Sequence, residues 1–197
     1  VDYFIKKGFN KNKIISIPNG IIHRELKSNY TQNKYINILT VARFVVQKDY
    51  FTAIDAIKYL IENLNSDQAL SIKYTIVGYG VLEQEIRNHI KNEGLDKYII
   101  IHINPPNVFS FFEKADIFLL SSLVEGTSNS LMEALAFSIP AIVTDAGDNK
   151  YLVKNNYNGY VVNTKDYKKI AFHLFDLIKN SKTRELFGKM GHKKVFQ

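Results

Sequence analysis

The 197-residue chain has no cysteine, and no apolar run in it approaches the ~20 residues that a transmembrane helix requires. The lack of cysteine excludes a disulfide scaffold, a thiolate nucleophile and a cysteine-ligated zinc site, and it fits a reducing compartment. Residues 1–8 do not resemble a signal peptide, and the chain does not begin with methionine. We therefore expect the chain to be a segment of a longer protein.

Acidic residues are fewer than basic ones: the chain has 19 Asp and Glu residues and 26 Lys and Arg residues, which give a net charge of +7. This excess fits a lysine-rich solvated surface, an anionic small-molecule ligand or an anionic membrane surface. Nucleic acid is not expected as a partner, because the sequence contains no Arg- and Lys-rich helix and no RNA-binding aromatic motif. Hydrophobic residues make up 46% of the chain, which is enough for a large buried core.

Short apolar runs alternate along the chain with amphipathic helical patterns, and neither internal repeats nor low-complexity linkers interrupt them. Nearly continuous apolar runs such as Ile117–Leu120 are typical of parallel strands that are buried on both faces. The alternation predicts an α/β fold, with a doubly wound, mostly parallel sheet and helices on both faces. The predicted strands are Lys13–Ile17, Ile36–Ala42, Ser71–Val77, Tyr98–Ile103, Ile117–Leu120, Ala141–Thr144 and Tyr160–Val162, and the predicted helices are Tyr50–Leu64, Leu82–Asn92, Val108–Lys114, Asn129–Phe137, Asp166–Lys179 and Thr183–Lys194.

Three loops that follow predicted strands contain candidate binding residues. Arg43 and Lys48 leave the end of one strand together and can reach one diphosphate, although both can also be ordinary surface cations. Gly78 and Gly80 form a turn that either brings the backbone close to a ligand or has a structural purpose only. Glu83 stands where a dinucleotide-binding fingerprint has its third glycine, which disfavours binding of a nicotinamide cofactor. The proline-rich loop 103–107 is either a surface for a flat base or a rigid connector.

A fourth segment, 121–140, carries two carboxylates, Glu125 and Glu133, around the point where a strand ends and a helix begins. In open α/β folds such a point favours phosphorylated ligands, because free backbone N–H groups and the positive helix end face outward there. Gly126 and the following polar residues allow amides to point at an anion. Glu133 can accept hydrogen bonds from two hydroxyl groups, or it can form a capping box with Ser130 that needs no ligand.

The ordered series of motifs resembles the C-terminal half of retaining GT-B glycosyltransferases, in particular glycosyltransferase family 4, also called group 1. The motifs are Ile-Pro-Asn-Gly, Ala-Arg-x4-Lys, Val-Gly-x-Gly, Ala-Asp-Ile-Phe-Leu-Leu-Ser-Ser, Glu-Gly-x6-Glu-Ala-Leu-Ala and Ile-Pro-Ala-Ile-Val-Thr-Asp-Ala-Gly, followed by Asn158-Gly159. The resemblance runs from about residue 14 to about residue 180. Thr127-Ser128-Asn129 replaces the Phe-Gly-Leu that this family often has, and the usual Gly-Gly before a later Glu becomes Gly147-Asp148, with Tyr151 in the place of that Glu.

The resemblance implies a Rossmann-like domain that binds a nucleotide sugar and carries residues with assigned roles. Residues 1–35 would be the tail of a missing N-terminal domain and a connector, residues 36–180 the nucleotide-sugar-binding domain, and residues 181–197 a C-terminal helix. Arg43 and Lys48 would hold the diphosphate, Glu125 would contact the transferred sugar, and Glu133 would bind the ribose hydroxyls. The remaining donor-binding residues would be Gly78, Gly80, Gly126 and the backbone amides around Asn129 and Ser130.

The implied reaction is hexosyl transfer with retention from a UDP- or GDP-sugar, in surface polysaccharide, lipopolysaccharide or glycan biosynthesis. We expect no cofactor and no metal, because the sequence has no Asp-x-Asp and two cations can replace the metal's charge. The acceptor, a glycan or a lipid-linked sugar, would be bound by the missing domain, and this chain alone would transfer nothing. The implied location is the cytoplasm or the inner face of the membrane, with peripheral membrane association of the full-length enzyme. The alternatives are a non-catalytic nucleotide-binding module, or an epimerase or phosphorylase of the same fold.

Overall fold

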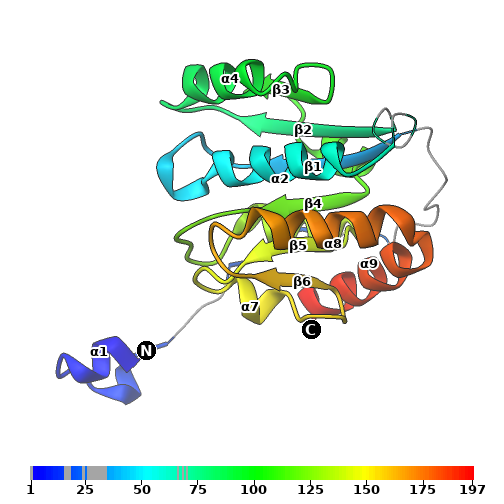
Figure 1. The fold of residues 1–197 in the computed structure, drawn as a ribbon. Helices are drawn as coiled ribbons and strands as arrows, with labels where there is room; N and C mark the ends of the chain where they lie inside the picture. Colours follow the sequence, from blue (N-terminus) through cyan, green and yellow to red (C-terminus); the bar gives the residue numbers. More distant parts are fainter. Residues whose placement is uncertain are drawn as a thin grey trace.

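The computed structural model describes residues 2–15, 19–23, 25, 35–65, 67, 69 and 71–197 (Figure 1). A six-stranded sheet forms the centre of the molecule, with the strand order β3-β2-β1-β4-β5-β6. Every neighbouring pair of strands is parallel, which confirms the predicted doubly wound α/β class. The strands are β1 (Ile36–Val41), β2 (Ile72–Gly78), β3 (Ile99–Ile103), β4 (Ile117–Leu120), β5 (Ala141–Thr144) and β6 (Gly159–Val162).

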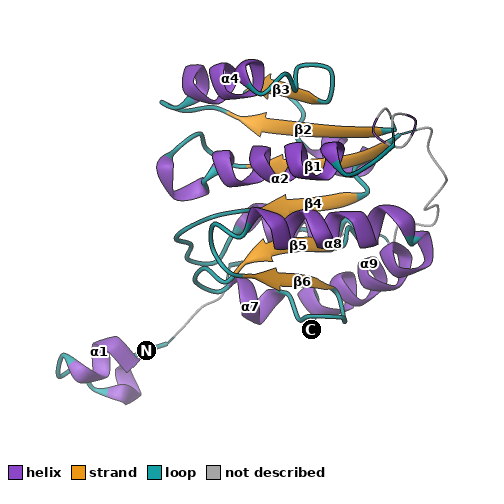
Figure 2. Cartoon of the chain, viewed as in Figure 1, coloured by secondary structure: helices purple, strands orange, loops and turns teal. Residues whose placement is uncertain are grey.

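Two clusters of buried hydrophobic side chains cover the two faces of the sheet, because successive residues of a strand point to opposite sides. Ile38 and Ile117 pack in one cluster, whereas their neighbours Leu39 and Phe118 pack in the other. The first face is covered by α2 (Tyr50–Glu62), α4 (Glu83–Asn92) and α8 (Tyr167–Lys179), and the second by α5 (Phe109–Lys114), α6 (Asn129–Ala136) and α7 (Asn149–Leu152). Figure 2 shows these helices flanking the sheet.

The last helix, α9 (Ser181–Val195), packs against α6, and the imidazole Nδ1 of His192 lies 2.9 Å from the carbonyl oxygen of Ala136. None of the helices among the described residues is long and apolar enough to cross a membrane.

The strand expected over Lys13–Ile17 is wrong where the structure describes it. Lys11–Lys13 forms a 3₁₀ turn, because the side chain of Asn10 accepts a hydrogen bond from the amide of Asn12 at 2.9 Å and so closes a tight local turn. Residues 16–18, which include the rest of that expected strand and the proline of the Ile-Pro-Asn-Gly motif, lie outside the described residues. Residues 24 and 26–34, which form most of the segment between the first two predicted strands, also lie outside them. An opening helix, α1 (Asp2–Lys6), was not predicted.

Candidate functional site

The carboxyl ends of all six strands meet at one edge of the sheet, since the strands are parallel. β1 and β4 are neighbours in the centre, but their next strands in sequence, β2 and β5, lie on opposite sides of them. The connections therefore run in opposite directions from this pair, and ligands of open α/β sheets bind in the crevice at such a switch point. The candidate residues after β1 and β4 lie at this point, as the sequence predicts.

Lys48 and Glu125 form an ion pair at the switch point, with 2.5 Å between Nζ and Oε1. A short 3₁₀ turn, Val46–Lys48, brings the lysine into place, and the Ser122 hydroxyl donates to the same Glu125 oxygen at 2.6 Å. The two charged side chains are only 16% and 7% exposed. This direct contact was not predicted, because the two residues are 77 positions apart in the chain.

The two loops that carry this ion pair are also held together by uncharged groups. The amide of Leu123 donates to the carbonyl of Gln47 at 2.8 Å, and the Ser121 hydroxyl donates to the carbonyl of Asp49 at 2.8 Å. Asp49 adopts a left-handed conformation and caps α2, where its side chain accepts from the hydroxyl of Thr52. The ion pair therefore has a fixed backbone frame on both sides.

Arg43 lies two residues after the end of β1 and is exposed. Its side chain makes no hydrogen bond or ion pair with any part of the chain that the structure describes, whereas the residues on either side are anchored. The phenol of Tyr50 donates to the carbonyl of Ala42 at 2.8 Å, and the ring of Phe44 is fully buried edge-to-face against Tyr50. The backbone that carries the Arg43 guanidinium is thus held in place on both sides, at the edge of the site.

Gly78 and Gly80 are explained by backbone packing between the first two loops. A Cβ on Gly78 would lie 1.9 Å from the carbonyl oxygen of Ala42, and a Cβ on Gly80 would lie 2.5 Å from that of Phe44. The amide of Phe44 donates to the carbonyl of Tyr79 at 2.8 Å. These contacts give both glycines a structural reason, and their role in donor binding stays a prediction. The proline-rich loop is tied to the same turn, because the amide of Asn104 donates to the carbonyl of Gly78 at 3.1 Å.

The helix α6 begins two residues earlier than a Ser130 cap would require. Ser128 is the N-cap, and its hydroxyl accepts from the amide of Leu131 at 3.4 Å. The alternative capping box between Ser130 and Glu133 is therefore wrong. Because the first amides of a helix have no acceptor within the helix, those of Asn129 and Ser130 lie at its positive end.

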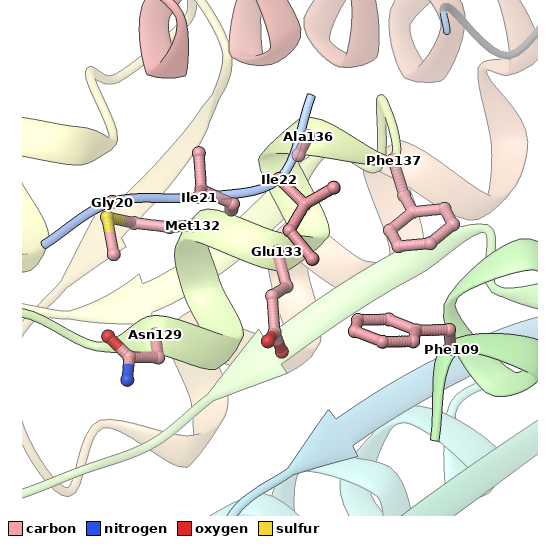
Figure 3. A pocket seen from close by; sticks show the side chains of 9 residues that line it. All are labelled: Gly20, Ile21, Ile22, Phe109, Asn129, Met132, Glu133, Ala136 and Phe137. Atoms are coloured by element: carbon pink, nitrogen blue, oxygen red, sulfur yellow. The ribbon is translucent and has the colours of Figure 1, made fainter. Parts of the chain in front are cut away.

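Glu133 and Asn129 line a cavity of about 220 Å³ beside α6 (Figure 3). The Glu133 carboxylate points into the space between Asn129 and Phe109. The other end of the cavity is apolar and aromatic, and the connector forms one wall, where the amide group of Asn19 donates to the side-chain oxygen of Asn129 at 2.8 Å. All lining residues are Gly20, Ile21, Ile22, Phe109, Asn129, Met132, Glu133, Ala136 and Phe137.

Sequence reasoning missed Phe109 and the connector as parts of this cavity. Phe109 directly follows the proline-rich loop, and that position was the signal available for it. Asn19 and Gly20 belong to the Ile-Pro-Asn-Gly motif, but the motif does not indicate what they contact, since Asn19 and Asn129 are 110 positions apart and only the fold brings them together.

The loop after β5 supports the Glu125 loop from the other side. Gly147 has a left-handed φ of +55°, and a Cβ there would lie 2.1 Å from the carbonyl oxygen of Glu125. The Thr127 hydroxyl donates to the carboxylate of Asp148 at 2.6 Å, and the buried Thr144 hydroxyl donates to the carbonyl of Ser122 at 2.5 Å. The short helix α7 that follows was not predicted. Gly126 faces open space.

The described residues contain no group of three or more His, Cys, Asp and Glu side chains placed to hold a metal ion. The charges that the structure does bring to the switch point are the Lys48–Glu125 pair, with Arg43 at the start of the same loop and the positive end of α6 beginning four residues after Glu125. An anion with several oxygens matches this set of donors.

The fold and the site define a doubly wound α/β domain whose ligand crevice lies at the switch point of a parallel sheet. The family of glycosyl transferases group 1 matches residues 22–194, and the chain belongs to this family. A curated relative, the amylovoran biosynthesis glycosyltransferase AmsK of Erwinia amylovora, is 30% identical over 150 residues, which cover 72% of this chain and 36% of that protein.

Solved structures share the fold. A mutant of S. aureus TarM, in complex with fondaparinux, alpha-GlcNAc-glycerol and UDP, is 18% identical with a TM-score of 0.86, over 98% of this chain and 38% of that one. The C-terminal domain of the group 1 family protein LpcC from Francisella tularensis is 25% identical with a TM-score of 0.70, over 82% of this chain and 84% of that domain. The chain therefore spans little more than a third of AmsK and TarM, and most of the isolated C-terminal domain of LpcC.

Proposed function

We propose that this chain is the donor-binding half of a glycosyltransferase that transfers a hexosyl group from a nucleotide sugar with retention. The observation that carries the proposal is the Lys48–Glu125 pair at the switch point, four residues before the amino-terminal end of α6. Membership in the group 1 family supports the reaction class, and the UDP in the TarM complex makes UDP the first nucleotide to test.

Each candidate residue has a role in this proposal. Lys48 and Arg43 neutralise the leaving diphosphate, where negative charge develops in the transition state, and the amides of Asn129 and Ser130 add to that stabilisation. Glu125 contacts the transferred sugar. The Glu133 carboxylate in the cavity accepts hydrogen bonds from the ribose hydroxyls. Gly78, Gly80 and Gly126 keep the backbone accessible to the donor.

The acceptor, a glycan or a lipid-linked sugar in polysaccharide biosynthesis, is bound by the part of the protein that lies outside this chain. AmsK acts in amylovoran biosynthesis and supports this pathway class. We therefore expect the 197-residue chain to bind nucleotide weakly and to transfer no sugar. Measurable turnover by the purified chain contradicts the second expectation. Binding that persists in EDTA is expected, because two cations and a helix end take the place of a metal.

Calorimetry with UDP, GDP and their sugars tests donor binding. The change Glu133→Gln removes a charged hydrogen-bond acceptor, and a loss of ~1.5–3 kcal/mol, roughly 10- to 100-fold in affinity for the nucleoside part, is expected. Glu113→Gln on the exposed face of α5 makes the same chemical change away from the cavity and should leave binding unaltered. If millimolar nucleotide gives no binding to the unaltered chain, a non-catalytic interaction module replaces the proposal. Conversion of a nucleotide sugar without an acceptor by the full-length protein points instead to an epimerase.

A further inference from the structure

The outer surface of α8 carries two exposed phenylalanines between lysines. Phe172 is 60% exposed and Phe175 40% exposed, although both belong to a helix whose other apolar residues, such as Leu174, are buried. Lys168, Phe172, Phe175 and Lys179 follow the spacing i, i+4, i+7 and i+11, which places them on one stripe of the helix. This stripe, called here the α8 stripe, faces away from the sheet.

The α8 stripe continues onto α2, which lies beside α8 on the same face of the sheet (Figure 1). A shallow apolar groove between the two helices is lined by Tyr59 of α2, by Asn63 at its C-terminal cap, and by Lys168, Phe172 and Phe175. The ring of Tyr59 is partly exposed and stacks edge-on against Tyr167 at 6.0 Å between ring centroids. The apolar surface is therefore broader than one helix.

The cations stay close to the aromatic rings. The ammonium of Lys169 lies 4.6 Å from the centre of the Phe172 ring, and that of Lys179 lies 5.0 Å from the Phe175 ring. Long lysine side chains beside exposed rings are typical of surfaces that place rings at the acyl boundary and ammonium groups among anionic headgroups.

The acidic groups near the stripe are already engaged within the protein. Asp166 caps the helix and accepts from the amide of Lys169, and Asp176 accepts from the phenol of Tyr160 at 2.5 Å. On α2, Asp55 contacts His89, and Lys58 contacts both Glu93 and Glu62. These groups line a second pocket, which also borders Tyr59 and Tyr167. The four residues that define the stripe are thus two cations and two rings, which complement a negative surface.

We propose that the α8 stripe is a docking surface for an anionic lipid membrane. The occupant is a lipid surface, because the exposed rings are few and flanked by cations at both ends of the stripe, and because the chain carries a net charge of +7. Docking by this face sets the sheet flat against the membrane, with the strands running along it. The switch-point edge then opens sideways, parallel to the membrane plane.

Vesicle flotation tests this docking directly. The chain should bind vesicles that contain about 30% phosphatidylserine or phosphatidylglycerol far better than vesicles of phosphatidylcholine alone. The reason is that each lysine near an anionic surface adds ~1 kcal/mol, or ~5-fold in affinity. Two double variants, Phe172→Ser with Phe175→Ser and Lys168→Glu with Lys179→Glu, should each lose at least about 10-fold.

The matched control is Lys114→Glu with Lys154→Glu, which changes the net charge equally on exposed positions away from α8. This control should lose less than about 3-fold, since its charges do not face the lipid. Equal losses in the two charge-reversal variants would mean attraction by net charge only and overturn the proposal. Equal binding to neutral vesicles overturns it as well.

A fluorescent reporter gives a second measurement that does not depend on loss of binding. The chain has no tryptophan, so Phe172→Trp introduces a single emitter. Its emission should shift to the blue and be quenched by brominated lipid in anionic vesicles, whereas Trp at the exposed Leu186 of α9 should not respond. If no vesicle changes the Phe172→Trp emission and the Phe variants abolish a concentration-dependent dimer, the face binds a second copy of the chain and the lipid proposal fails.

Discussion

The Lys48–Glu125 ion pair leads to a prediction in which either substitution lowers stability, whereas the two substitutions affect the binding of UDP differently. The pair lies between two limits, since exposed pairs contribute ~0–1 kcal/mol and breaking a buried pair costs ~3–5 kcal/mol. Because its side chains are 16% and 7% exposed, Lys48→Met and Glu125→Gln should each lower the free energy of unfolding by about 2–3 kcal/mol. The double variant should lose less than the sum, with a coupling energy of ~1–2 kcal/mol.

Urea unfolding of the unaltered chain, the two single variants and the double variant measures this coupling energy. A second double-mutant cycle, on Lys150 and Asp145, is the control. That pair lies 3.2 Å apart at the same edge of the sheet, but its side chains are 53% and 46% exposed. It should couple by ~0–0.5 kcal/mol. Additive losses for Lys48 and Glu125 would refute the claim that the pair acts as a unit.

If the proposed function holds, binding of UDP distinguishes the role of Lys48 from that of Glu125. Lys48→Met should weaken UDP binding by ~10- to 100-fold, because a charge-assisted contact to phosphate is lost. Glu125→Gln should bind UDP as tightly as the unaltered chain or tighter, since Lys48 is released from its carboxylate partner, and it should lose affinity only for the nucleotide sugar. A loss of UDP affinity of about 10-fold or more in Glu125→Gln would contradict this division of roles.

Two further predictions concern the frame of the site and the core beneath α8. Gly147→Ala should destabilise the chain by at least ~1–3 kcal/mol in urea, because its Cβ meets the Glu125 carbonyl at a positive φ, whereas Gly126→Ala, which meets open space, should change stability by less than ~0.5 kcal/mol. Burial, and then the charge of Lys169, lower the pKa of His173 to about 4. The unfolded chain therefore binds more protons between about pH 4 and 6.5, so stability is fully present above pH 6.5 and falls toward pH 4. His173→Gln should flatten this part of the stability profile, and an unchanged slope would show that another group causes it.

The strands and long helices could be predicted because each leaves a periodic trace of its own. Ile117–Leu120 reads as a doubly buried strand from composition alone, and the structure has it with the same bounds. A helix of about one turn leaves no such trace, which is why α7, with four residues, was missed. The strand predicted over residues 13–17 was wrong where it is described. A local polar cap at Asn10 outweighs the apolar residues that follow it.

The candidate site could be predicted as a set of loops but not as a set of contacts. Parallel strands send Arg43, Glu125 and the proline-rich loop to one edge, and this follows from topology. That Lys48 reaches Glu125, or that Gly78 must admit the carbonyl of Ala42, depends on distances between segments remote in sequence. The capping box failed for the opposite reason, because a local pattern fitted Ser130 while Ser128 was already the cap.

Two contacts of the site join residues 77 and 110 positions apart, and this has a consequence for the stage of folding at which the site forms. A chain emerging from the ribosome can form β1, β2 and β3 by pairing segments near one another, but β1 gains its partner β4 only after residue 120. Until then Lys48 has no carboxylate and α6 does not exist. If the proposed function holds, a nucleotide sugar can therefore stabilise only a chain that has folded up to about the end of α6. It would then act late in folding and on the resistance of the folded protein to unfolding.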